Sequence, residues 1–433
     1  MRMEIVDPEV PTGHFCTPIT CCRICGSTEL LLVIDLGSQQ IGTHVLDEET
    51  SAASARTYPL ELVRCAGSSG CGLLQLRHTL DSGALYERYG YRSGINRTMP
   101  ANLAGIVAQA RELVMLESND VVLDIGCNDG TLLDCYNDAQ VIRVGFDPSP
   151  NVAATAAAKG HQVAVDYFGA ARYRSMFPSR QAKIVTSIAM FYDLPDPMQF
   201  TADIAAVLDA DGVWVIELSY LPLMLKNHSY DTICHEHLEY YALRQIDWLL
   251  GKNGLKLQRV ALNDVNGGSF RLFVVHQTRE MQADDAEVEA VRQFERSFQL
   301  ESEQVYANFR TQVERSRNEL RNVIAHARSA GETIYVYGAS TKGNTILQFC
   351  GIDNSMVPRA ADRNPEKWGY RTPGSRIEIV SEEQARKEQP DYFLVLPWHF
   401  LEEFAARERD YLNGGGRFIV PLPEVRVLTA SDL

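Results

Sequence analysis

The 433-residue sequence has no apolar run long enough to cross a bilayer, and it is poor in positive charge. A membrane-spanning helix needs roughly 20 consecutive apolar residues, so we expect no membrane partner. Lys and Arg number 41 against 56 Asp and Glu, which gives a net charge of -15. Proteins that bind nucleic acid usually gather basic side chains on one face, so we expect no nucleic acid partner either.

The N-terminus also lacks the basic-then-apolar pattern of a signal peptide, because it reads MRMEIVDPEVPTGH. We therefore expect a cytoplasmic protein. Since that compartment is reducing, the ten cysteines are predicted to be metal ligands, core residues or free thiols instead of disulfides. A content of 45% apolar and 22% charged residues is typical of a folded chain with two or three cores.

The composition divides the chain into four regions. Residues 1–95 are rich in cysteine and turn residues, and predict a small module. Residues 96–280 alternate helical stretches with short apolar strands, which is typical of a parallel α/β sheet. Residues 281–330 are highly charged, contain neither Pro nor Gly, and predict a helical connector. Residues 331–433 return to strands and helices, and predict a second, smaller α/β domain.

The firmest functional signal is VVLDIGCNDG at residues 121–130. An apolar strand ends near Asp124 and passes through Gly126 and Gly130 into the predicted start of a helix. Glycines let a ligand approach the backbone closely. The spacing differs from the Gly-x-Gly-x-x-Gly of dinucleotide sites, and Asn128 with the carboxylate after it would crowd a phosphate. The turn therefore favours a cationic ligand without phosphates.

Acidic residues follow the next two predicted strands. Asp147, followed by Pro148, ends the second strand, where a carboxylate can accept both hydroxyls of a ribose. Asp166 and Tyr167 follow the third strand and are expected to reach an adenine. Each feature alone is common in α/β proteins, but their order predicts a class I methyltransferase sheet with S-adenosylmethionine as cofactor.

Cysteines of the N-terminal module predict a structural zinc site. Four thiolates from two turns suit tetrahedral zinc, which would replace the core that so short a segment lacks. The second pair is separated by five residues instead of two. There are therefore two alternatives. Cys16 or Cys21 could replace one ligand, or the cysteines could be free thiols. The predicted ligands are Cys22, Cys25, Cys65 and Cys71.

The densest polar segment is YDTICHEHLEYY at residues 230–241, after the fifth strand of the central region. The acceptor of such a fold lies over the carboxyl ends of the strands, so we expect this segment to face it. His235, Glu236 and His237 suit proton transfer, because the pKa of histidine lies near neutrality. One alternative is that His235, His237 and Glu239 bind a metal. Another is that one of the histidines is purely structural.

Taken together, eight segments resemble the family of sugar C-methyltransferases that act on nucleotide-linked deoxy-4-ketosugars. The resemblance covers nearly the whole chain, in order. It implies a class I S-adenosylmethionine methyltransferase domain with a Rossmann-like sheet, flanked by a small zinc-binding N-terminal domain and a second, C-terminal Rossmann-like α/β domain. The segments are CRICG, VVLDIGCNDGTLL, GFDPS, DTICHEHLEYY, NGGSFRLFV, YGASTKGNT, DRNPEKWGYRTPG and IVPLPE.

The resemblance implies methyl transfer to the carbon next to a ketone, typically C-3 of a TDP-sugar on a pathway to a branched antibiotic or surface sugar. It assigns His237 as the base, assisted by Glu236, and places Gly268 near the acceptor. The residues suit this chemistry, since a proton beside a carbonyl is weakly acidic. A base must remove it while something stabilises the enolate oxygen.

Two segments depart from the family pattern on the acceptor side. Cys234 stands where the family usually has Tyr, and residues 189–195 replace an Asn-x-Phe-Ala-His segment. Tyr192 or Asp193 is the candidate for the missing polar role. The alternative functions are an O- or N-methyltransferase for another small molecule and a non-catalytic zinc- and nucleotide-binding scaffold.

A second glycine-rich turn, YGASTKGNT at residues 337–345, lies between a predicted strand and helix. Its backbone amides with Ser340 and Lys342 are candidates to bind the diphosphate of a sugar nucleotide. The alternative is a folding turn with a solvated lysine. Arg271 is a further candidate phosphate partner. The sequence leaves the oligomeric state open, a monomer included.

Overall fold

The structure of the protein is a computed structural model. No helix among the described residues is long and apolar enough to cross a membrane. Some predicted features lie outside the residues that the structure describes. They are the absence of a signal peptide, the domain boundaries at 95/96 and 280/281, and part of the loop between the second pair of cysteines. The described residues are 16–47, 56–67, 70–86, 90–94, 98–137, 140–280 and 285–433.

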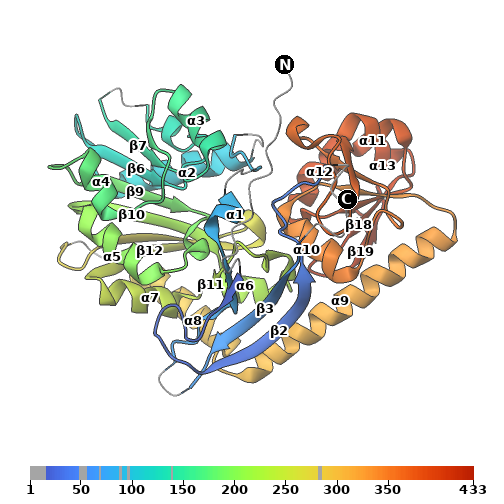
Figure 1. Ribbon diagram of the computed structural model, residues 1–433, viewed down its shortest axis with the longest axis horizontal. Coiled ribbons are helices and arrows are strands. Elements are labelled where there is room, and N and C mark those ends of the chain that lie inside the picture. Colours follow the sequence, from blue (N-terminus) through green and yellow to red (C-terminus); the bar gives the residue numbers. More distant parts are fainter. Residues whose placement is uncertain are drawn as a thin grey trace.

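The central region forms a seven-stranded sheet with helices on both faces (Figure 1). The strand order is β12-β13-β10-β9-β6-β7-β8, and β13 alone runs antiparallel to its two neighbours. Residues 121–125 are all buried, as expected of a parallel strand covered on both sides. The strands are β6 (Val121–Ile125), β7 (Ile142–Phe146), β8 (Gln162–Ala164), β9 (Ala182–Ile188), β10 (Leu208–Ser219), β12 (Leu255–Asn263) and β13 (Ser269–His276).

Helices of the central region begin at residues suited to that position. In α5, Asp196 accepts a hydrogen bond from the Gln199 backbone N–H at 2.9 Å, and Pro197 occupies the first helical position. The helices are α2 (Thr98–Leu113), α3 (Pro150–Ala158), α4 (Ala170–Met176), α5 (Pro197–Val207), α6 (Leu221–Lys226) and α7 (Leu243–Lys252).

The helix predicted directly after Gly130 is wrong. Only a short 3-10 turn, Leu133–Cys135, follows the glycine. The Asp129 carboxylate accepts hydrogen bonds from both the backbone N–H and the hydroxyl of Thr131, at 3.2 and 2.6 Å. Such a local side-chain turn competes with the helical backbone pattern.

The N-terminal module contains a four-stranded antiparallel sheet in the order β11-β4-β3-β2 and a separate pair, β1-β5. The strand β11 (Glu239–Tyr240) belongs to the polar segment 230–241 of the central region, and its Glu239 lies opposite Gln75 of β4. The predicted catalytic segment thus completes the sheet of the N-terminal module. The other elements are β1 (Cys16–Pro18), β2 (Leu30–Gln39), β3 (Tyr58–Cys65), β4 (Leu74–Leu76), β5 (His78–Leu80) and α1 (Ser82–Tyr86).

The C-terminal region is a second α/β domain with the strand order β16-β15-β14-β17-β18-β19, parallel except for β19. The predicted fold class is therefore confirmed. The strands are β14 (Ile334–Tyr337), β15 (Arg359–Asp362), β16 (Glu378–Ser381), β17 (Tyr392–Val395), β18 (Arg417–Val420) and β19 (Arg426–Leu428), and the helices are α10 (Thr341–Cys350), α11 (Glu382–Glu388), α12 (Leu401–Arg407) and α13 (Arg409–Asn413).

Two helices connect the central and C-terminal sheets. They are α8 (Asp285–Phe298) and α9 (Glu303–Ser329), and α9 runs from beneath the N-terminal sheet to the C-terminal domain (Figure 1). One hydrophobic cluster includes Leu62 of β3, Tyr230 of the polar segment, Leu320 of α9 and Leu347 of α10. The N-terminal module, the polar segment and the C-terminal domain therefore share a core.

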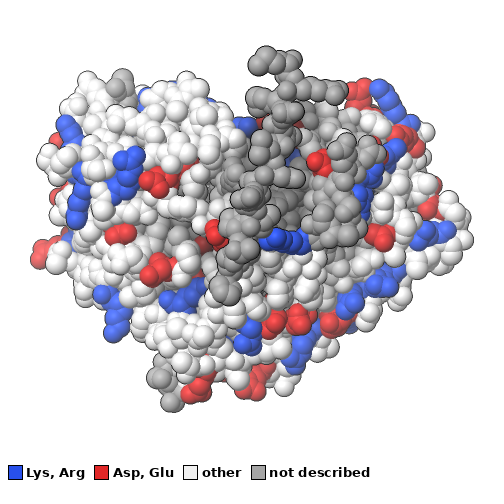
Figure 2. Space-filling model, viewed as in Figure 1, with Lys and Arg blue, Asp and Glu red and all other residues white. Residues whose placement is uncertain are grey.

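Charged side chains of both signs are distributed over the face shown in Figure 2. Blue Lys and Arg alternate with red Asp and Glu across the described surface of that face, and no continuous basic stretch covers it.

Candidate active site

A cavity of about 800 Å³ lies between the central sheet and the C-terminal domain. Its walls include the turns at the carboxyl ends of β6, β7 and β9, the end of the polar segment, and the turns after β14 and β15. Residues from both glycine-rich turns therefore meet in one space. The predicted site residues that line it are Asp124, Gly126, Asn128, Asp147, Pro148, Asp166, Tyr167, Tyr192, Asp193, Glu236, His237, Ser340 and Lys342.

Gly130 and His235 do not line the cavity. A Cβ on Gly130 would lie 2.8 Å from Cδ2 of His161, so this glycine permits close packing beneath the turn. The His235 side chain points to the N-terminal sheet, where Nε2 lies 3.2 Å from the Tyr58 carbonyl oxygen. This contact supports the alternative that one of the two histidines is structural, and a part of His235 in proton transfer stays a prediction.

Arg271, Gly268 and Cys234 also lie away from the cavity lining. Arg271 is buried in an ion pair with Glu217 at 2.7 Å, a position that corrects its assignment as a phosphate partner. Gly268 lies against Leu223, since a Cβ there would come within 2.7 Å of that side chain. Cys234 is only 3% exposed, so it packs inside the polar segment.

The wall formed by β6 is shaped by Asp124 and Gly126. Asp124 is 3% exposed, and the Thr186 hydroxyl donates to its Oδ1 at 2.6 Å. Burial raises the pKa of Asp124 to about 7, although this hydrogen bond opposes the change. Gly126 has a φ of 73°, and its missing side chain makes room for Met190 from the turn after β9.

Asp147, at the end of β7, is held in place by the backbone. Its two carboxylate oxygens accept hydrogen bonds from the Asn128 and Ser149 N–H groups, each at 2.9 Å. The carboxylate thereby joins the first and second turns of the sheet, and it faces the cavity together with the half-exposed Tyr167. This arrangement fits the adenosine part of S-adenosylmethionine.

A segment without a recognisable sequence motif covers the first turn. The Ser93 N–H donates to Oδ1 of Asn128 at 3.0 Å, and Nδ2 of Asn128 donates to the Tyr91 carbonyl at 3.1 Å. The Gly94 N–H donates to Asp129 at 2.9 Å. The polar residues of the cofactor turn thus hold residues 90–94 against the cavity.

His237 presents one ring nitrogen as a base. Its Nδ1 lies 2.8 Å from the Thr232 carbonyl oxygen, which can only accept, so Nδ1 carries the proton and Nε2 keeps its lone pair. Burial and the positive charge of Lys342 lower the pKa of His237 to about 3, so the ring is neutral at pH 7. The Tyr192 ring packs beside it, with 4.3 Å between ring centroids.

Burial raises the pKa values of two carboxyl groups near His237. Burial raises the pKa of Glu236 to about 8, and its Oε1 has no hydrogen-bond partner among the described residues. Burial and the charges of Glu236 and Glu239 raise the pKa of Asp193 well above its usual range. A protonated carboxyl can donate a hydrogen bond to an acceptor molecule.

The second glycine-rich turn repeats the arrangement around Asp147. At the end of β15, the two carboxylate oxygens of Asp362 accept hydrogen bonds from the Ala339 N–H at 3.0 Å and the Asn364 N–H at 2.8 Å. Asp362 thus joins the turns after β14 and β15 and lines the same cavity. Its position at the end of the second strand of a Rossmann-like unit is the sequence signal that identifies it.

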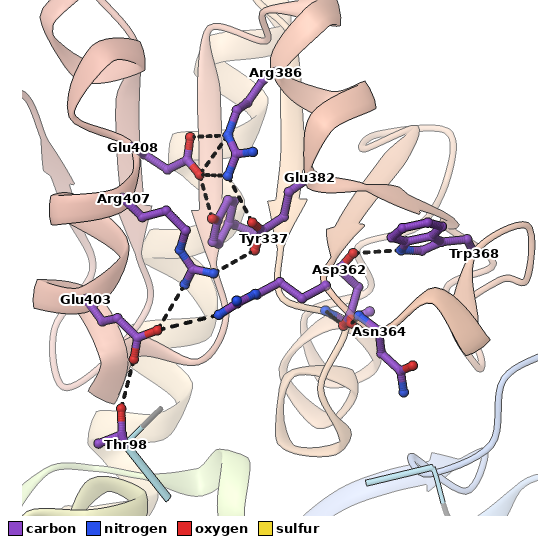
Figure 3. Close-up of polar contacts among 12 residues, drawn as sticks. Thr98, Tyr337, Asp362, Asn364, Trp368, Glu382, Arg386, Glu403, Arg407 and Glu408 are labelled. Carbon is purple, nitrogen blue, oxygen red and sulfur yellow. Dashed lines mark hydrogen bonds and ion pairs between the residues drawn. The ribbon is translucent and has the colours of Figure 1, made fainter. Parts of the chain in front are cut away.

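Polar contacts join the two domains at the rim of the cavity. Figure 3 shows Glu403 accepting a hydrogen bond from the Thr98 hydroxyl of α2, at 2.9 Å, while Arg407 holds its other oxygen. Arg92 pairs with Glu366 at 3.0 Å. Residues on both sides of the cavity are therefore bonded to one another.

The four predicted zinc ligands lie together in the N-terminal module. The sulfur atoms of Cys22 and Cys71 are 3.5 Å apart, as are those of Cys25 and Cys65, and all four sulfurs lie within 4.8 Å of one another. Zinc–sulfur bonds of about 2.3 Å place tetrahedral ligands roughly 3.8 Å apart, so this donor set fits zinc. The alternative ligands Cys16 and Cys21 are outside the group.

The zinc ligands contact the polar segment through Arg23, which lies between the first two cysteines. Its Nη1 donates to the Leu76 carbonyl at 2.7 Å, and its Nε lies 3.5 Å from Glu239. Glu239 pairs with Arg23, and His235 points to the N-terminal sheet. Glu239 and His235 therefore do not form a metal site with His237.

Comparison with known proteins agrees with these observations. Family models described as "Putative zinc binding domain", "Methyltransferase domain" and "C-methyltransferase C-terminal domain" match residues 22–86, 91–260 and 264–423. C-methyltransferase NovU of Streptomyces niveus is 33% identical over 417 residues, which cover 96% of this chain and 98% of NovU. The chain belongs to the C-methyltransferase family.

Two solved methyltransferase structures each align with 42% of this C-methyltransferase. Magnesium protoporphyrin IX methyltransferase of Synechocystis PCC 6803, with bound SAM, is 16% identical over 42% of this chain and 78% of its own, with a TM-score of 0.31. The plantazolicin methyltransferase BpumL, in complex with SAH, is 11% identical over 42% and 86%, with a TM-score of 0.34.

Membership of this family establishes the enzyme class. The protein is an S-adenosylmethionine-dependent C-methyltransferase, with S-adenosylmethionine and zinc as its cofactors. These predictions are confirmed. The alternatives of an O- or N-methyltransferase and of a non-catalytic scaffold find no support.

Proposed function

We propose that this C-methyltransferase methylates the carbon next to the ketone of a nucleotide-linked deoxy-4-ketosugar of the TDP type, with His237 as the base. The observation that carries the proposal is the free Nε2 of His237 in a cavity with a cofactor turn on one wall and a second nucleotide-type turn on the other. The first turn accounts for the methyl donor. The second accounts for a nucleotide on the acceptor.

The support for a nucleotide is the geometry of Asp362. It accepts two backbone hydrogen bonds just as Asp147 does, and both carboxylates line the cavity. A sugar nucleotide bound at the C-terminal turn would extend its sugar toward the central sheet. Ser340 begins α10 and faces this path.

Each residue near the acceptor has a chemical task in this proposal. S-adenosylmethionine supplies an electrophilic methyl group when bound. His237 removes the proton beside the ketone, and protonated Glu236 donates a hydrogen bond that orients the sugar. Tyr192 packs on the His237 ring and fixes its plane, while Asp193 supplies the polar contact that the family places in a histidine.

We also propose the domain division expected from the sequence. Residues 1–95 form the zinc-binding domain, 96–280 the methyltransferase domain, 281–330 the helical connector and 331–433 the C-terminal Rossmann-like domain. The separate sheets and the helices α8 and α9 support this division. The polar segment 230–241 is an exception, because it adds β11 to the N-terminal sheet.

The test is methylation of a panel of TDP-4-ketosugars with labelled S-adenosylmethionine. We expect label on the carbon next to the ketone, located by NMR of the product. A matched panel of sugar nucleotides without the ketone is the control and should stay unlabelled. Label on oxygen or nitrogen, or no transfer to any ketosugar, would contradict the proposal.

A further inference from the structure

Lys342 differs from the other basic residues that line the cavity. Among the described residues of the lining, the others are Arg92, Arg363 and Lys367. Each of these pairs with a carboxylate, at 3.0 Å to Glu366, 3.8 Å to Glu403 and 3.4 Å to Asp362, respectively. Lys342 instead donates one hydrogen bond to the Asn266 carbonyl, at 3.1 Å. An ammonium group has three donors, so two remain for an anion.

Lys342 lies on a wall of the cavity that the polar segment also forms. Its helix, α10, packs on the polar segment, where the Thr345 hydroxyl donates to the Ile233 carbonyl at 3.0 Å. The positive charge of Lys342 lowers the pKa values of both His237 and His399. All three residues line the cavity.

An acidic residue beneath Lys342 keeps its charge balanced. Asp231 is 1% exposed and accepts a hydrogen bond from Nε1 of Trp398 at 3.0 Å, while its Oδ1 has no hydrogen-bond partner among the described residues. Burial lowers the pKa of Lys342, but the carboxylate of Asp231 opposes this change. The buried carboxylate of Asp231 therefore favours the ammonium form of Lys342 at this wall of the cavity.

We propose that Lys342 is a catalytic residue that hydrogen-bonds the ketone oxygen of the acceptor and stabilises it as the enolate forms. In this step the C–H bond beside the ketone breaks and its proton forms an N–H bond on Nε2 of His237. The electron pair of the C–H bond forms the C=C bond of the enolate, and the carbonyl π pair moves onto the oxygen that Lys342 contacts. The inference rests on the proposed function.

The diphosphate that we first assigned to Lys342 has two other cations available in the cavity. Arg363 and Lys367 form long ion pairs, at 3.8 Å to Glu403 and 3.4 Å to Asp362, respectively. Ser340 already accepts a hydrogen bond from the Gly343 N–H through its hydroxyl, at 3.1 Å, as the cap of α10. The enolate oxygen of the acceptor would therefore contact Lys342, and its diphosphate would contact Arg363 and Lys367.

The test separates enolate formation from nucleotide binding. Exchange of the proton beside the ketone with deuterated solvent is followed by NMR on a TDP-4-ketosugar without S-adenosylmethionine, and TDP affinity is measured by calorimetry. We expect Lys342→Met to slow exchange by roughly 100-fold or more, with the Kd for TDP within about twofold of the native value. Lys342→Arg should restore part of the rate.

Controls keep the outcomes distinct. Lys387→Met, a change at an exposed lysine of α11, should leave exchange and TDP binding unchanged. If Lys342→Met does not fold, Lys342→Gln replaces it. Exchange that is unaffected in the variants, or a loss that follows a matching loss of TDP affinity, overturns the role of Lys342. Absence of both exchange and methylation in the native enzyme overturns the proposed function itself.

Discussion

The two histidines of the polar segment show how one backbone carbonyl defines a residue's chemistry. His237 donates from Nδ1 to Thr232, which leaves Nε2 in the cavity, whereas His235 turns its Nε2 to Tyr58 of β3. The side chains are two positions apart, and only one can serve a bound acceptor. The surrounding carbonyls, more than the residue type, therefore distinguish the proposed base from its neighbour.

His237→Gln is expected to lower kcat by about 10²–10⁴-fold, because an amide cannot take a proton at neutral pH. The Kd for S-adenosylmethionine should not change, since the cofactor turn lies on another wall. Initial rates and calorimetry check these expectations. Because the pKa of His237 is about 3, the native rate should show no inflection near pH 6.5 from this residue. A variant rate within tenfold of the native rate would exclude His237 as the base.

Glu236 makes stability depend on pH in a direction opposite to that of most carboxylates. The folded protein holds this proton up to about pH 8, whereas the unfolded chain releases it near 4.5. Stability from this group is therefore full below pH 4.5 and is lost as pH rises to about 8.

Relative to Glu236→Gln, the free energy of unfolding of the native protein should fall by at least about 1 kcal/mol between pH 5 and pH 8. Urea denaturation at several pH values measures the difference. Glu314→Gln, at an exposed glutamate of α9, is the control and should show no such trend. A constant difference across this range would show that Glu236 is ionised in the folded protein.

Several site residues were predictable because they follow strand ends in a recognised order. Asp124, Gly126 and Asp147 belong to that group. Residues 90–94 were not predictable, because only the folded turn shows that Asn128 and Asp129 bond to them. Arg271 was misassigned because sequence cannot show that Glu217 lies opposite it on the neighbouring strand.

At the scale of elements, β11 joins the polar segment to the zinc-binding sheet. Glu239 and Tyr240 pair with Gln75 and Leu74. The Gln245 side chain of α7 also donates to the Cys71 carbonyl, at 2.8 Å. Loss of zinc should therefore disturb the position of His237.

Cys71→Ser is expected to lower the zinc content, the Tm and kcat together, because three remaining thiolates hold the metal weakly and the sheet supporting β11 loosens. S-adenosylmethionine should still bind with a Kd within a few fold of the native value. Metal analysis, thermal denaturation and calorimetry provide the three measurements. Cys135→Ser, at a cysteine outside the cluster, is the control. An unchanged kcat in a zinc-free variant would contradict the coupling.

Periodicity predicted the elements with strong patterns and missed others. The strands β6, β7, β9 and β10 and the charged helices α8 and α9 carry strong patterns. Strand β12 was missed because its burial is mixed, and β11 because two residues have no pattern of their own. Its pairing depends on contacts with a sheet about 165 positions earlier in the chain.

At the scale of the whole molecule, the rim contacts join the central domain to the C-terminal domain across the cavity. Arg92→Ala should raise the KM for the acceptor by no more than roughly fivefold, because a partly exposed ion pair contributes about 0.2–1 kcal/mol. The charge exchange Arg92→Glu with Glu366→Arg should recover part of this loss. Steady-state kinetics measure both. A single change that removes all activity would show that Arg92 contacts substrate directly.

The opposed carboxylates Asp147 and Asp362 also have a consequence for inhibitor design. Both line one enclosed space, and each belongs to its own domain. A bisubstrate compound that links adenosine to thymidine through a short bridge would reach both ends in a single association, and would lose translational and rotational freedom once instead of twice. A methyltransferase that consists of the central sheet alone has no second domain to bind the thymidine part. Such a compound should therefore bind it more weakly than it binds this protein.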